Sequence, residues 1–201
     1  MIRVPAWLVL LVALGACDRQ AIRPADAPAR FFADVAALCG GAYAGRIVAD
    51  EPAPTGADPF AGKRLVMHVR DCTHDTLRIP FHVGDDRSRT WVLTRTSAGL
   101  TLKHDHRHAD GSSDAVTMYG GDTTQTGTAA RQEFPVDEFS SALFMREGLT
   151  ASLTNTWALE IEGGERFVYE LTRPGGRRFR VAFDLTRRVA TPPAPWGDAA
   201  R

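Results

Sequence analysis

The sequence has no excess of positive or negative charge, few cysteines and no common catalytic motif. Its 24 basic and 24 acidic residues give a formal net charge of +0, which excludes the strongly basic surface of an obligate nucleic-acid-binding protein. Balanced charge with 44% hydrophobic residues also excludes an intrinsically disordered chain. A chain of 201 residues is long enough to form one domain that buries its own core.

The motifs that mark the common catalytic centres are missing. The chain has no G-x-S-x-G or S-x-x-K nucleophile motif, no G-x-G-x-x-G or phosphate-binding loop, and no H-E-x-x-H zinc motif. The sequence therefore assigns no catalytic residue, and it leaves open whether the protein is an enzyme.

Long apolar runs are absent except at the N-terminus. Arg3 precedes an apolar segment, from Val4 to Ala13, that is shorter than the ~20 residues a transmembrane helix needs. A basic residue followed by such a segment is typical of a signal peptide. The segment ends in Leu14-Gly15-Ala16-Cys17, which resembles the lipobox of bacterial lipoprotein precursors.

This resemblance implies cleavage before Cys17, diacylglycerol on its sulfur and acylation of the new amino group. Under this interpretation, residues 1–16 are a signal peptide and residues 17–29, with Pro24 and Pro28, form a lipidated tether. The alternative is an ordinary secretory signal without lipidation. The resemblance places the protein on a bacterial membrane, facing the periplasm. Asp18 resembles an inner-membrane retention signal, but the choice between inner and outer membrane stays open.

Two cysteines remain once Cys17 is lipidated. Exported domains commonly join such a pair, so we expect a disulfide between Cys39 and Cys72. No C-x-x-C motif indicates a redox pair. The closed loop of about 33 residues would contribute ~3.5 kcal/mol to the free energy of unfolding.

Hydrophobic periodicity predicts one β-rich domain over residues 30–190. A helix near Pro28 precedes it, with Asp26 as a candidate cap, and a short helix is expected over 137–147. Residues with a period of two lie near 65–69, 77–83, 91–93, 100–102, 153–161, 167–171 and 179–185, separated by turn signals. The pattern predicts a mainly β fold with a short N-terminal helix, in which an antiparallel barrel is favoured over a sandwich. The segment Gly41-Ala42-Tyr43-Ala44-Gly45 resembles the start of a lipocalin first strand, with Tyr43 where that family has Trp, which implies a barrel of the lipocalin kind. Residues 191–201 are expected to be a flexible tail, in which Trp196 could dock on the domain.

The most distinctive segment, residues 103–122, contains His104, His106 and His108 in an H-x-H-x-H pattern. In a strand these side chains share one face, in phase with Leu100 and Leu102, which are predicted to face inward. The segment, with Tyr119-Gly120-Gly121, resembles uncharacterised envelope proteins of Gram-negative bacteria. That resemblance implies no activity.

Three interpretations of the histidines are open. His104 and His106, with His108 or Asp110, could ligate Zn²⁺ or Fe²⁺. Alternatively, Arg95, His104 and His106 bind a polar or anionic ligand group at a pocket mouth. In the third interpretation the strand simply runs into a polar, hydrated loop.

The sequence thus predicts a lipid-anchored binding or accessory protein that needs no cofactor. Its partners would be the membrane and either a small apolar or amphipathic ligand or another envelope component. The alternative is a metal-binding protein or a metal-dependent enzyme that uses the histidine cluster.

Overall fold

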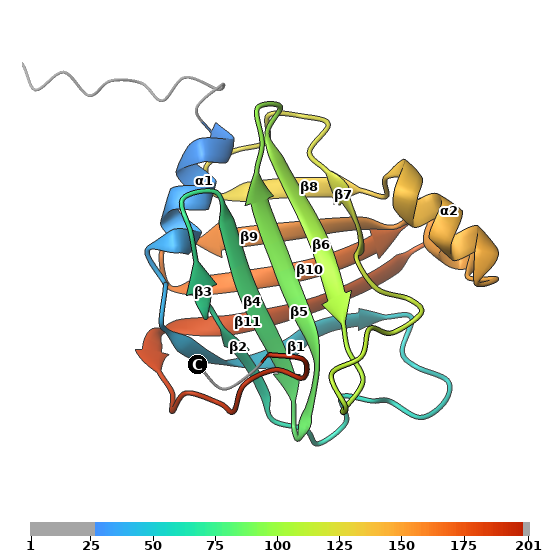
Figure 1. The fold of residues 1–201 in the computed structure, drawn as a ribbon, viewed down its shortest axis with the longest axis horizontal. Helices are drawn as coiled ribbons and strands as arrows, with labels where there is room; N and C mark the ends of the chain where they lie inside the picture. The colour runs from blue at the N-terminus through green and yellow to red at the C-terminus, as the bar shows by residue number, and fades with distance from the viewer. Residues whose placement is uncertain (1–26, 199–201) are drawn as a thin grey trace, which may run out of the picture.

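The computed structural model describes residues 27–198, whose strands form one antiparallel sheet curled into a nearly closed barrel (Figure 1). The sheet order is β7-β6-β5-β4-β2-β1-β11-β10-β9-β8, and β3 pairs only with β4. The elements are α1 (Ala27–Ala36), β1 (Ala42–Glu51), β2 (Leu65–His68), β3 (Asp71–Cys72), β4 (Thr76–Val83), β5 (Asp86–Arg95), β6 (Leu100–His106), β7 (Tyr119–Asp122), β8 (Arg131–Pro135), α2 (Glu138–Arg146), the 3-10 helix η2 (Thr150–Thr154), β9 (Thr156–Glu162), β10 (Arg166–Arg173) and β11 (Arg177–Arg188).

The barrel closes where its two edge strands, β7 and β8, approach each other. Gly121 forms an antiparallel bridge with Val136, and the Asp137 N–H donates to the Gly120 carbonyl at 3.1 Å. A Cβ atom on Gly121 would lie 1.8 Å from the Pro135 carbonyl oxygen. Only glycine therefore allows this approach, which decides between the two predicted architectures in favour of the barrel.

The inward faces of the strands carry the core, as the period-two pattern predicts. Leu77, Ile79, Phe81 and Val83 on β4 are all buried, and so are Phe179, Val181 and Phe183 on β11. Each predicted segment thus contains a strand, although residues 153–155 precede β9. The period-two pattern missed β1, β3, β7 and β8. β3 has only two residues, two of the four residues of β7 are glycines, and β1 does not alternate regularly between buried and exposed positions.

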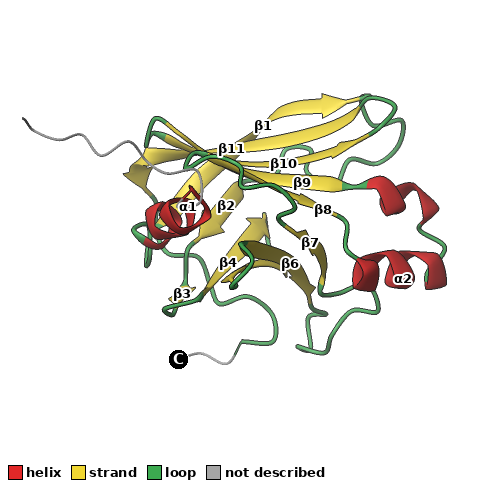
Figure 2. Cartoon of the chain, turned by 90° about the horizontal axis from the view of Figure 1, so that it is seen from above, coloured by secondary structure: helices red, strands yellow, loops and turns green. Residues whose placement is uncertain are grey.

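The helices lie toward opposite ends of the barrel (Figure 2). α1 buries Phe31, Phe32 and Val35 and covers one end. Asp137 caps α2 by accepting from the Ser140 N–H at 2.8 Å, in the predicted position. Because α1 begins at Ala27, the last three residues of the predicted tether belong to a helix instead.

The predicted signal peptide, the lipidated Cys17, the tether up to residue 26 and the Asp26 cap lie outside the described residues. No helix within residues 27–198 has the length and apolar character needed to cross a membrane.

The segments at both ends of the barrel sequence are attached to the barrel. The predicted disulfide is present: Cys39, just beyond α1, is bonded to Cys72 on β3. The segment 191–198, expected to be part of a flexible tail, is attached to the barrel wall. The backbone N–H of Trp196 donates to the Arg87 carbonyl at 3.1 Å, and Asp198 forms an ion pair with Arg70.

Candidate functional site: the barrel mouth

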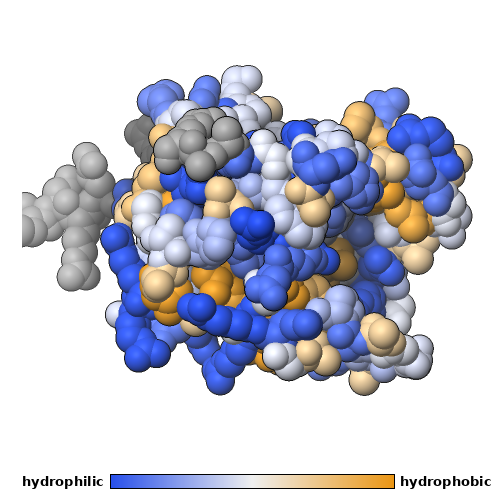
Figure 3. Space-filling view, turned by 60° about the horizontal axis from the view of Figure 1, so that its bottom comes forward, coloured by the Kyte–Doolittle hydropathy of each residue, from blue (hydrophilic) through white to orange (hydrophobic). Residues whose placement is uncertain are grey.

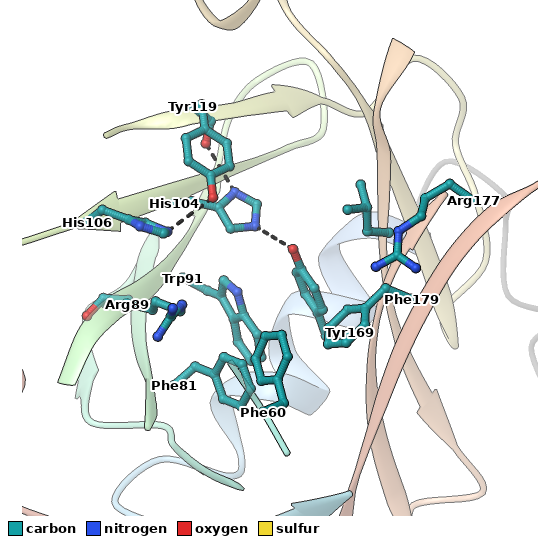
Figure 4. A pocket seen from close by; sticks show the side chains of 12 residues that line it. Phe60, Phe81, Arg89, Trp91, His104, His106, Tyr119, Tyr169, Arg177 and Phe179 are labelled. Atoms are coloured by element: carbon teal, nitrogen blue, oxygen red, sulfur yellow. Dashed lines mark hydrogen bonds between the residues drawn. The ribbon is translucent and has the colours of Figure 1, made fainter. Parts of the chain in front are cut away.

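The barrel end opposite α1, here called the mouth, contains a cavity of about 200 Å³. We call it the aromatic chamber, because aromatic side chains form most of its wall (Figure 4). These are Phe60, Phe81, Trp91, Tyr169 and Phe179, together with Tyr119 and His104.

Stacking keeps the wall of the aromatic chamber in place. The Trp91 ring lies between those of Phe81 and Tyr169, with centroid distances of 5.0 and 4.6 Å. These three residues come from β4, β5 and β10, so the rigid sheet positions them. Phe60 is different, because it belongs to the loop between β1 and β2 and packs 4.9 Å from Phe179.

His104 lies behind this wall and is only 3% exposed. Its Nδ1 is 3.1 Å from the Tyr119 carbonyl oxygen, which can only accept, so Nδ1 carries the proton. Nε2 therefore accepts from the Tyr169 hydroxyl at 3.0 Å. Burial lowers the pKa of His104 to about 3, so the ring is neutral at physiological pH.

His106 stands nearer the opening of the mouth. Its Nε2 is 3.1 Å from the Tyr119 hydroxyl, as Figure 4 shows. Burial lowers the pKa of His106 and raises that of Tyr119 to about 12. The imidazoles and hydroxyls of the mouth are therefore uncharged hydrogen-bonding groups at neutral pH.

Positive charge at the mouth comes from Arg89, Arg173 and Arg177, which continue the inward faces of β5, β10 and β11. Arg89 forms an ion pair with Asp86 at 2.5 Å, and Arg177 forms one with Asp50. Both guanidinium groups line the aromatic chamber.

A second hollow of about 300 Å³ adjoins the first, and we call it the α2 chamber. It shares His106, Tyr119, Tyr169 and Leu171 with the aromatic chamber. Asp114, Arg173 and residues of α2 and η2 complete its wall. Two apolar side chains of α2, Phe139 and Met145, are exposed. Figure 3 shows apolar surface at the right of the molecule.

The structure brings two of the predicted ligand-binding residues together and separates the third. His104 and His106 both line the aromatic chamber, as their inward phase predicts. Arg95 does not belong to this site, because it pairs with Leu100 at the α1 end of β5, whereas His106 pairs with Arg89. Arg95 instead contacts His74 at 2.9 Å and lies over the Phe32 ring.

The predicted metal ligands are not brought together either. His108 and Asp110 are exposed in the turn after β6, and both nitrogens of His104 are occupied by hydrogen bonds. Across residues 27–198, no group of three His, Cys, Asp or Glu side chains is placed to hold a metal ion.

Sequence reasoning missed several residues of the mouth. A signal for Arg89, Arg173 and Arg177 was available, since each keeps the inward phase of its strand. Arg178 and Arg180 have the opposite phase to Arg177 and lie outside the barrel, where both form ion pairs with Glu170. Phe60 lies in a loop and follows no period.

Comparison with known proteins places no constraint on the function. The chain matches no protein family, no curated protein and no solved structure. The function must therefore be inferred from the geometry of the mouth.

Proposed function

We propose that this protein binds a small apolar or amphipathic ligand in the barrel mouth. The observation that supports this function is the size and lining of the aromatic chamber, about 200 Å³ with rings on most sides. An apolar cavity of ~150 Å³ is enough to bind benzene. The chamber therefore suits a single ring with a short substituent.

The chemistry of the wall is that of a binding site. Stacked rings offer flat apolar surface, and a few polar groups, such as the Tyr119 hydroxyl and His106, can orient a ligand. Because the sheet positions most of the wall before any ligand arrives, little conformational entropy is lost on binding. Phe60 is on a loop, so its movement can open the chamber.

The proposed location is a bacterial membrane, with the domain facing the periplasm. Its support is the resemblance of Leu14-Gly15-Ala16-Cys17 to a lipobox. Residue 27 begins α1, at the end of the barrel opposite the mouth. A lipid anchor on Cys17 would therefore attach to the closed end of the barrel and leave the mouth free.

Native mass spectrometry of residues 18–201, purified from periplasm without chelator, tests the proposal. We expect a mass excess of organic-molecule size. The excess should disappear in Leu171→Trp, because Leu171 lines both chambers and the larger ring fills them. It should persist in Val48→Trp, a matched control at an exposed position on β1.

Two results would contradict the proposal. One is a bare mass combined with no change in tryptophan fluorescence on titration with single-ring compounds. The other is an excess of metal-ion size that is lost in His104→Ala/His106→Ala, which would favour the metal-binding alternative.

A further inference from the structure

Arg173 is the most unusual charged residue of the mouth. Its guanidinium is half-buried and donates to the Asn155 side-chain oxygen and, at 3.5 Å, to the Ser152 hydroxyl. Both partners are neutral. Among residues 27–198, no carboxylate lies within ion-pair distance of Arg173. Removing a cation from water without a counterion is unfavourable, so such a group is normally paired.

The hairpin of β10 and β11 adds a second unfavourable feature. Arg173 and Arg177 are direct cross-strand partners on the inward face. Side chains in such a pair have Cβ atoms about 5 Å apart, and like charges there destabilise the sheet. Asp50 neutralises Arg177 from one side, and the Phe179 ring supports its guanidinium at 5.7 Å. Nothing described neutralises Arg173.

The other charges at the mouth do not remove this imbalance. Asp86 is engaged by Arg89. Asp114 lines the α2 chamber with Arg173, but it accepts from the Val116 N–H and forms no ion pair with Arg173. A negative group between Arg173 and Arg177 would relieve both the missing counterion and the like-charge contact.

One small molecule is long enough to contact both the aromatic chamber and the arginine pair. Arg173 is two residues beyond Leu171 on the same face of β10, a separation of about 7 Å along a strand. Leu171 lines the aromatic chamber, so a ring there and an acid group at the arginines can belong to one ligand.

We infer that Arg173 and Arg177 bind the carboxylate of a single-ring aromatic acid whose ring lies in the aromatic chamber. This inference rests on the proposed function and adds the chemical class of the ligand. The carboxylate oxygens accept from the two guanidinium groups, and the ring stacks within the aromatic wall.

The test compares phenylacetate with phenylacetamide, which has nearly the same shape and no charge. Titration calorimetry with residues 18–201 measures both affinities. Hydrogen bonds to charged groups contribute about 1.5–3 kcal/mol, so phenylacetate should bind at least about tenfold more tightly. Added salt should weaken the binding of phenylacetate only.

Arg173→Gln removes the charge and keeps a side chain that can donate to Asn155. It should reduce phenylacetate affinity about tenfold and leave phenylacetamide affinity unchanged. Arg166→Gln is the matched control, because Arg166 is an exposed arginine of the same strand whose partner is Glu162. It should leave both affinities unchanged.

The outcomes separate this inference from the proposed function. Equal affinity for the two probes, or an equal loss of both in Arg173→Gln, overturns the carboxylate clamp and leaves a ligand-binding mouth. Failure of both probes, with a ligand seen by native mass spectrometry, overturns the aromatic acid alone. Failure of both probes with a bare native mass overturns both proposals.

Discussion

Acid should destabilise this fold well before its carboxylates protonate, because two histidines are buried in the neutral form. Burial lowers the pKa of His104 to about 3, and burial with the nearby His68 lowers that of His82 to about 4. Both side chains regain a pKa near the ordinary 6.5 when the chain unfolds. The unfolded state therefore binds more protons than the folded state in this range, so the free energy of unfolding decreases as pH falls below 6.5.

The magnitude follows from the size of the two shifts. Each pKa unit corresponds to ~1.4 kcal/mol, so His104 contributes up to about 5 kcal/mol and His82 up to about 3 kcal/mol. Between about pH 7.5 and about pH 4 the two together remove roughly 6 kcal/mol, which is comparable to the whole stability of many domains. Over the steep part the slope is about 2.7 kcal/mol per pH unit. His68 and His106, whose pKa values burial also lowers, act in the same direction.

Urea unfolding followed by tryptophan fluorescence, repeated across this pH range, measures that slope. His104→Gln retains groups able to donate to the Tyr119 carbonyl and accept from the Tyr169 hydroxyl but cannot titrate. Its free energy of unfolding should be lower at neutral pH, because ring packing is lost. Its slope should fall by about 1.4 kcal/mol per pH unit, since one proton less is taken up.

His108→Gln is the control, because His108 is exposed in the turn after β6. It should keep the wild-type slope. A His104→Gln variant with an undiminished slope would show that His104 does not cause the acid sensitivity. The assignment of a neutral, hydrogen-bonded imidazole behind the aromatic chamber would then be wrong.

Three further changes test how the fold is held together. Gly121→Ala places a methyl group against the Pro135 carbonyl, so β7 and β8 must separate, and urea unfolding should show a loss of at least about 2 kcal/mol in the free energy of unfolding. An unchanged urea midpoint would refute the close contact between β7 and β8. Cys39→Ala/Cys72→Ala opens a loop of 33 residues and should lower the free energy of unfolding by about 3.5 kcal/mol. A reducing agent should destabilise the wild type by the same amount and should have no effect on the variant. Asp105→Asn removes a buried carboxylate that pairs with Arg78 and Arg107, and calorimetry should show a loss of about 3 kcal/mol in the free energy of unfolding. A change below about 0.5 kcal/mol would mean that solvent already screens these pairs.

The elements of this barrel could largely be predicted from local pattern. Alternation along β4 and β11 indicated strands with one buried face, and the short helix expected over 137–147 is α2. The inward phase of His104 and His106 was also correct. These features depend on residues a few positions apart, so they are visible in any short window of sequence.

The sequence favoured a barrel over a sandwich, but local pattern could not decide between them. The decision lies at β7 and β8, whose contact depends on Gly120 and Gly121 meeting Pro135 and Val136 from a distant part of the chain. Two of the four residues of β7 are glycines, so this strand also shows no hydrophobic period.

The residues of the mouth show most clearly which features the sequence determines and which depend on strand pairing. The sequence by itself determined the phase of Arg89, Arg95, Arg173 and Arg177 along their strands, although only Arg95 was predicted to line a pocket. Only the antiparallel register decided that Arg95 lies at the end covered by α1 while Arg89 lies beside His106. Phase is set by the pleat of one strand, whereas the end of the barrel that a residue reaches is set by how strands pair. The pairing of Arg173 with Arg177, and the contact of Phe60 with Phe179, likewise arise only when distant segments are folded together.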